Sequence, residues 1–176
     1  MYNIQTISNT NTFKRIYYLK ATIDYSDILA IVDSREKTPL DLSPIQSKVG
    51  TLTTGDYSVF GLESHISVER KSLPDMVMCC GSERERFSKE IKRLLSYSVR
   101  AVVIEASWDD IKKGGWRSSL TPNHVIGSIV GWSCLGVPFF MAGSDAGDIV
   151  SRILLQGARK KYSEIYRMLK QGGFNA

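Results

Sequence analysis

Short apolar runs recur along the chain and predict the strands of a sheet. Residues 28–33 (ILAIVD) and 101–105 (AVVIE) are continuous apolar runs that end in a carboxylate. Such runs are typical of strands that are buried on both faces of a sheet. Turn residues bound three further predicted strands, at residues 57–60, 65–71 and 137–141.

Between these runs the apolar residues follow helical spacing. Those of residues 87–95 lie three and four positions apart, so they share one face of a helix. Ser82 followed by Glu85 predicts a capping box at the start of this helix. Thr121 predicts the start of another helix, and Ser144 the cap of a long final one. Because strands alternate with helices, the sequence predicts an α/β fold with a mixed sheet between helix layers.

The chain has 176 residues, which suits one domain whose core needs neither disulfide nor zinc. We expect residues 1–27 to form an arm or an irregular edge strand, residues 28–170 the domain, and residues 171–176 a flexible tail. Three cysteines, two of them adjacent, do not make a disulfide framework and suit a reducing compartment. No apolar signal core opens the sequence. We therefore expect a cytoplasmic protein of a prokaryotic or phage-infected cell, or a nuclear one in a eukaryote.

One apolar stretch has the length of a membrane span. Residues 125–142 contain no charge over 18 positions. Pro138, two serines and three glycines interrupt the stretch, and no basic flank follows it. These features favour a buried helix, a glycine turn and a short strand, so we expect no membrane association.

Positive charge is concentrated at one end of the chain. The net charge is +5, and residues 151–176 carry six basic residues against one acidic residue. A basic terminal helix is a weak indication of a polyanionic partner. A solvated helix face explains the same charge equally well.

The candidate chemistry lies in Asp56, Glu69 and Lys71. Side chains alternate along a strand, so Glu69 and Lys71 share one face, and Asp56 at the start of the neighbouring strand adds a second carboxylate. A divalent cation relieves the repulsion between two close carboxylates, and oxygen ligands suit Mg²⁺ or Mn²⁺. The cation activates water and a phosphoryl group, while Lys71 stabilises the transition-state charge. The pattern therefore indicates phosphodiester hydrolysis, although a solvated strand face accounts for it equally well.

A longer set of motifs surrounds these residues. Residues 32–36 read VDSRE, residues 55–57 read GDY, and residues 68–75 read VERKSLPD. In this order they resemble the nuclease domain of the XPF/Hef structure-specific endonucleases, a family marked by VDxRE, GD and ERKx3D. The resemblance covers roughly residues 28–160 and includes Arg86-Phe87, with Glu90 where the family more often has Gln.

The resemblance implies a restriction-endonuclease-like, PD-(D/E)XK fold and Mg²⁺- or Mn²⁺-dependent cleavage of DNA, often branched or flapped. It implies Asp56 and Glu69 as metal ligands and Lys71 as the catalytic lysine. Asp33 becomes a further acidic residue of the site. Supporting roles fall to the remaining motif residues, with Arg70 and Asp75 expected as an ion pair behind the site: Arg35, Glu36, Arg70 and Asp75.

Partners follow from the same resemblance. Family members usually form dimers through the last helices of the nuclease domain, here residues 125–135 and 149–155. Arg86 is the best candidate for a phosphate contact on its helix. A basic, glycine-rich loop at residues 112–117 offers Lys112, Lys113 and Arg117 as DNA contacts. A plain connector explains this loop better, because loops often carry such residues.

The leading hypothesis is therefore a metal-dependent DNA endonuclease that acts as a homodimer. Residues 161–176 are too few for the helix-hairpin-helix module that usually follows this domain in the family. A non-catalytic, DNA-binding partner subunit of a nuclease complex remains the alternative, and a ribonuclease or single-strand nuclease is a third.

Overall fold

The computed structural model describes residues 23–171, so most of the predicted N-terminal arm and most of the predicted tail lie outside the described residues. A six-stranded sheet runs through the molecule in the order β2-β1-β3-β4-β5-β6. The strands are β1 (Leu29–Asp33), β2 (Gln46–Gly50), β3 (Tyr57–Val59), β4 (Ile66–Lys71), β5 (Val99–Ile104) and β6 (Phe139–Met141).

The sheet is mixed, as the sequence predicts. β3 pairs antiparallel with β1 and with β4, whereas β1–β2, β4–β5 and β5–β6 are parallel pairs. The three-residue strand β3 thus joins two parallel pieces, and Tyr57 at its start is opposite Val68 of β4. This junction brings the residue before β3 close to the carboxyl half of β4.

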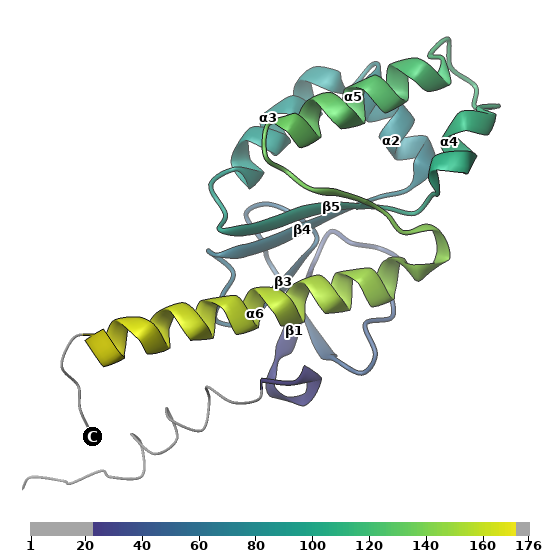
Figure 1. Cartoon of the computed structure of the whole chain (residues 1–176). Coiled ribbons are helices and arrows are strands. Elements are labelled where there is room, and N and C mark those ends of the chain that lie inside the picture. Colours follow the sequence, from purple (N-terminus) through teal and green to yellow (C-terminus); the bar gives the residue numbers. More distant parts are fainter. Residues whose placement is uncertain (1–22, 172–176) are drawn as a thin grey trace, which may run out of the picture.

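Helices cover both faces of the sheet (Figure 1). The long helix α6 (Ala146–Gln171) lies on one face, and four helices lie on the other. Those four are α2 (Leu73–Cys80), α3 (Arg84–Leu94), α4 (Trp108–Lys113) and α5 (Pro122–Cys134). Two short 3-10 helices, η1 (Tyr25–Asp27) and η2 (Gly143–Asp145), precede β1 and α6.

Each helix layer closes its own hydrophobic core. Ile66 and Val68 of β4 pack in the core beneath α6, together with Leu154. Phe87 and Ile91 of α3 pack in the core beneath the other four helices. Side-chain alternation along β4 therefore leaves Glu69 and Lys71 on the face of α2–α5, as the sequence predicts.

Several element boundaries differ from the sequence-based expectation. Strand β2 was not predicted, because its side chains are exposed and QSKVG carries no apolar pattern. The predicted capping box of Ser82 and Glu85 is wrong: α3 begins at Arg84, and its N-cap Glu83 makes no side-chain cap. The predicted cap Ser144 lies inside η2, two residues before α6 begins.

The apolar stretch at residues 125–142 forms part of α5, a glycine turn and β6, as predicted. Within the described residues, no helix is both long and apolar enough to cross a membrane. Val125 and Ile129 of α5 and Leu154 of α6 are buried in the cores of this chain. Much of the two segments predicted to form a dimer interface is thus used inside one molecule.

The tight packing of α6 predicts a large cost for a truncation on its buried side. Leu154→Ala should lower the free energy of unfolding by about 2–5 kcal/mol, because Leu154 is fully buried beneath the sheet. Urea unfolding followed by circular dichroism measures the change. Met168→Ala on the same helix is the control, because Met168 is 71% exposed and its loss should cost at most about 0.5 kcal/mol. Equal costs for the two variants would contradict this packing.

Candidate active site

Gly55 fixes the position of Asp56. Gly55 has φ +78°, and a Cβ there would lie 3.0 Å from the Val68 carbonyl oxygen and would collide with the Ser67 hydroxyl. Glycine therefore lets the chain pass closely beside β4. The Asp56 N–H then donates to the Val68 carbonyl at 2.8 Å, and the Asp33 N–H donates to the Asp56 carbonyl at 2.8 Å. Asp56 is thus held by its own backbone between β1 and β4.

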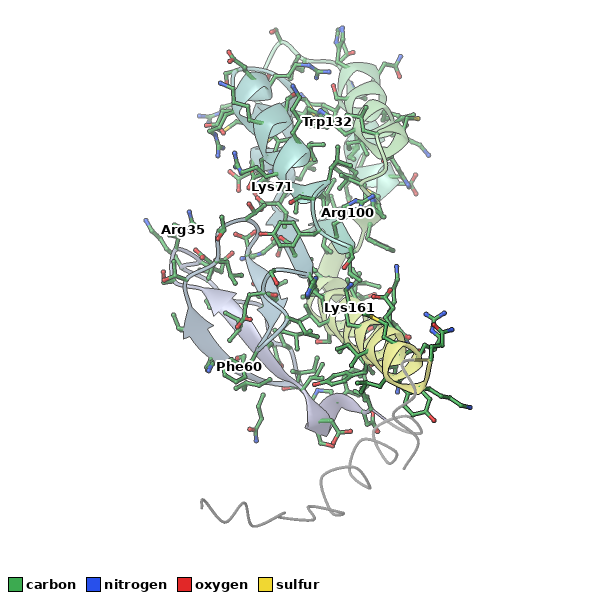
Figure 2. All side chains as sticks on the ribbon, turned by 90° about the vertical axis from the view of Figure 1, so that its left-hand side faces the viewer. Arg35, Phe60, Lys71, Arg100, Trp132 and Lys161 are labelled. Atoms are coloured by element: carbon green, nitrogen blue, oxygen red, sulfur yellow. The ribbon has the colours of Figure 1, made fainter. Side chains whose placement is uncertain are left out.

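Glu69 and Lys71 form the second half of the site. Glu69 is 2% exposed, and its Oε1 forms an ion pair with the Lys71 ammonium. The other oxygen, Oε2, is buried and accepts no hydrogen bond from the described residues. Figure 2 shows Lys71 where the sheet meets the helices α2–α5, with Arg35 at the outer edge. Sequence spacing and structure thus agree on a carboxylate and a lysine side by side.

Asp56 and Glu69 share a poorly solvated environment. Burial raises the pKa of Asp56 to about 6, although the Arg70 N–H and Lys71 oppose this shift. Burial also raises the pKa of Glu69 well above its usual value, and the neighbouring Asp56 raises it further. Burial alone would lower the pKa of Lys71, but Glu69 and the other nearby carboxylates outweigh it and raise that pKa. The two acids therefore hold their negative charges at a high cost.

Glu90 on α3 is a third carboxylate at this site, and it was not among the predicted site residues. Its charge raises the pKa of both Asp56 and Glu69, in addition to the effect of burial. Glu90 follows Phe87 by three residues, and the Lys71 ammonium lies 5.5 Å from the Phe87 ring centre. This spacing puts Glu90 one turn beyond Phe87 on the same side of α3. It is the feature of the sequence from which the position of Glu90 at the site could have been predicted.

Arg70 points to the opposite face of the sheet and supports β4. Its guanidinium donates to both oxygens of Glu105, at 2.7 and 3.0 Å, and lies 3.2 Å from Glu36. It also donates to the Thr38 carbonyl at 2.8 Å. The expected ion pair of Arg70 with Asp75 is wrong: the Ser72 hydroxyl donates to Asp75, which belongs to the start of α2. Glu105, the real partner, was missed because it lies 35 residues further along the chain.

Asp33 is buried and fully engaged. It accepts hydrogen bonds from the Arg35 side chain at 2.6 and 3.2 Å and from the N–H groups of Arg35 and Leu52 at 3.0 and 2.7 Å. The hydrogen bonds from Arg35 lower the pKa of Asp33 to about 2 against the effect of burial, and the Leu52 N–H adds to the lowering. With both oxygens occupied, Asp33 orders the loop beside Asp56. Its predicted part in the reaction stays a prediction.

The predicted DNA contacts lie on the exterior, among the helices on the face of Lys71. Arg86 forms an ion pair with Glu83, and Lys112 and Lys113 pair with Asp109 and Asp110. The expected loop at residues 112–117 is only partly a loop, because α4 ends at Lys113. A capping box of Ser107 and Asp110 begins this short helix, which the sequence analysis did not predict. Arg117 follows α4 in the connection to α5.

Asp56 and Glu69 fit a divalent cation. They offer hard oxygen ligands, and no described residue donates a hydrogen bond to the buried Glu69 Oε2. Among residues 23–171, no group of three or more His, Cys, Asp or Glu side chains is arranged to hold a metal ion. A cation at this place would therefore have two protein carboxylates and complete its shell with water, as Mg²⁺ commonly does.

Comparisons with known proteins agree with this arrangement. The ERCC4 domain family matches residues 30–149. XPF from Aeropyrum pernix superimposes with a TM-score of 0.59 at 17% identity over 80% of this chain and 69% of that chain. A structure of XPF from Aeropyrum pernix in complex with DNA gives a TM-score of 0.58 at 19% identity over 76% and 66%.

This chain thus spans about two thirds of the length of those structures. No curated protein matches it. The structural likeness confirms the predicted restriction-endonuclease-like fold. Because the family match takes in most of the sheet and every residue of the candidate site, the chain belongs to the ERCC4 domain family and forms an XPF-type nuclease domain.

Proposed function

We propose that this protein is a metal-dependent DNA endonuclease that hydrolyses phosphodiester bonds. The observation that carries the proposal is the half-buried Asp56 and the buried Glu69 beside Lys71. One Glu69 oxygen accepts no hydrogen bond from residues 23–171. DNA as the substrate is supported by the similar archaeal XPF structure that contains DNA. Flap, fork or otherwise branched DNA is the substrate class that the sequence resemblance favours.

Each residue of the site has a definite task in this proposal. Asp56 and Glu69 would hold Mg²⁺ or Mn²⁺, which supplies an activated water and polarises a phosphoryl oxygen. Lys71 stands beside Glu69, where its ammonium orients the attacking water and stabilises the charge that develops on the phosphate. Arg70 and Glu105 keep β4 in register with the chain after β5, so that Glu69 and Lys71 stay aligned.

We also propose a homodimer, and the exposed side of α5 is its best-supported interface. Val130 and Leu135 are large apolar residues that remain exposed on or just after this helix. Gly127 and Gly131 are spaced as in GxxxG, and a Cβ at either would meet no atom within 4 Å. A second copy packed here would cover these residues without disturbing the cores.

Replacement of either acid tests the proposal directly. Asp56→Asn and Glu69→Gln should each lower metal-dependent cleavage by at least about 100-fold, since each removes a charged ligand and leaves the shape nearly unchanged. Cleavage of end-labelled single-stranded, duplex, flap and fork DNA would be measured with Mg²⁺, with Mn²⁺ and with EDTA.

Asp109→Asn is the matched control, because Asp109 is exposed on α4 and pairs with the equally exposed Lys112. Cleavage that survives in both site variants would refute the assignment. A well-folded wild-type protein that binds DNA and never cuts it would favour the non-catalytic partner subunit.

Burial of Asp56 also predicts how stability depends on pH without added metal. The pKa of Asp56 is about 6 in the folded protein and near 3.8 in the unfolded chain, so the unfolded chain releases this proton first. Stability should therefore fall as the pH rises from about 4 to about 6. The pKa of Asp33 is lowered to about 2, so Asp33 has the opposite effect. Its contribution makes stability rise with pH, in a pH range below that of Asp56.

Chemical unfolding in EDTA at a series of pH values measures this effect. Asp56→Asn should be more stable than the wild type at pH 8 and should lose that advantage at pH 4. A constant difference between the two proteins over this range would contradict the buried, costly charge.

Glu90 should strengthen cation binding, because its negative charge adds to those of Asp56 and Glu69. Glu90→Gln should weaken Mn²⁺ binding by about tenfold, the effect of one nearby charge in a partly solvated site. Isothermal titration calorimetry in the absence of DNA measures this change. Glu85→Gln, an exposed position on the same helix, is the control. Equal Mn²⁺ affinities of Glu90→Gln and Glu85→Gln would show that Glu90 does not contribute to cation binding.

A further inference from the structure

A cavity lies on the face of the sheet that α6 covers, beside the edge strand β6. It has a volume of about 490 Å³ and is lined by β5, the turn before β6, β6 and α6. Apolar groups form much of its wall, including Pro138, Phe140 and Ile153. Three cations also line it: Arg100, Arg152 and Lys160. An apolar wall and a cationic rim together suit a ligand with both a flat apolar part and negative charge.

The cationic rim continues along α6. Residues on one face of this helix lie three and four positions apart and point away from the buried side that holds Val150 and Leu154. They are Arg152, Gln156, Lys160, Ser163, Arg167 and Lys170. All six are exposed and none is acidic. From the first to the last, the stripe extends about 27 Å at the rise of an α-helix.

Two carboxylates on the same helix offset part of this charge. The hydrogen bond from Lys161 and the charges of Lys160 and Arg167 lower the pKa of Glu164. Arg152 pairs with Asp148 in an exposed contact. Arg100 donates to the carbonyls of Gly136 and Tyr97, at 2.9 and 2.7 Å. Within residues 23–171, no ion pair joins Arg100, Lys160, Arg167 or Lys170 to an acid. The surface still carries a net positive charge, which favours a polyanion.

Phe140 indicates which kind of polyanion this surface would bind. It is 40% exposed on the edge strand, and its ring lines the cavity next to the cations. Aromatic side chains beside a basic groove are typical of proteins that bind single-stranded nucleic acid, because unpaired bases stack on the ring. A base within a duplex is already stacked and paired, so it cannot enter the cavity.

The cavity is separate from the candidate active site but near it. In the parallel register of β4 and β5, Arg100 is opposite Ser67 and Ile104 is opposite Lys71. Four residues along a strand correspond to about 13 Å. In Figure 2, Arg100 lies between Lys71 and Lys161. The cavity and α6 lie on the face of the sheet opposite to Glu69 and Lys71.

We propose that the cavity and the stripe of α6, together called the α6 groove, bind a single-stranded segment of DNA. A base stacks on Phe140, and the phosphates contact Lys160, Arg167 and Lys170. The inference rests on DNA as the proposed substrate and adds a place for its unpaired strand. A flap or fork contains an unpaired strand, and in this proposal the α6 groove is the surface that binds it.

Binding in EDTA tests the α6 groove without any cleavage. Fluorescence anisotropy would measure the affinity of the full chain for a labelled oligothymidine and for a duplex of equal length, over a range of salt concentrations. Lys160→Glu/Arg167→Glu/Lys170→Glu should weaken single-strand binding by at least about tenfold. Loss of three phosphate contacts should also reduce the slope of log affinity against log salt by about 2.

Two further variants make the test specific. Phe140→Ala should weaken binding of the single strand by about tenfold and leave duplex binding nearly unchanged, because only unpaired bases stack on the ring. Lys48→Glu/Lys89→Glu/Lys92→Glu carries the same change in net charge on the other elements β2 and α3. This control should retain the single-strand affinity to within about twofold of the wild type.

Three results would overturn the proposal. One is an equal loss of binding in the groove and control triple variants, which would reflect net charge alone. Another is a Phe140→Ala protein that binds both DNAs as the wild type does. The third is a groove variant that binds DNA normally but loses a dimer in light scattering, which would assign the cavity to a second copy. Cleavage by the wild type with Mn²⁺ is scored separately, so failure of the nuclease proposal stays distinguishable.

Discussion

The rest of this structure depends on two neighbouring carboxylates, the half-buried Asp56 and the buried Glu69. Asp56 and Glu69 lose much of their hydration. Lys71 pairs with Glu69, and the backbone N–H of Arg70 donates to Asp56. Burial of like charges is costly, and a folded protein keeps such a pair only where the surrounding elements hold it firmly. The other contacts around the site provide this support.

The support comes from backbone contacts and from an ion-pair network on the other face of the sheet. Gly55 allows the chain before β3 to press against Ser67 and Val68, which places Asp56 through main-chain hydrogen bonds rather than through its side chain. Arg70 joins β4 to Glu105 and Glu36. Because successive residues of β4 face opposite sides, these contacts secure the strand without occupying the site.

The sequence predicted the parts of this arrangement that depend on local pattern. Apolar runs located β1 and β5, and alternation put Glu69 and Lys71 on one face. Strand β2 was not predicted, because it is an edge strand whose exposed side chains leave no apolar pattern. Helix α4 was not predicted, because it has only six residues. Partners across the sheet were the harder part: Asp75 was expected for Arg70, but only the parallel pairing of β4 with β5 brings Glu105 to it.

Helix α6 shows how one element serves two purposes without conflict. Its first half packs Val150, Leu154 and Ala158 beneath the sheet, and Gly157 lets it approach Ile66 and Val99 closely. The cationic stripe occupies the opposite side of the same helix, so charges can change there without altering a single core contact. Helical periodicity thus separates the residues that stabilise the domain from those free to meet a polyanion. The division parallels that of β4, where alternate residues build the core and the candidate active site.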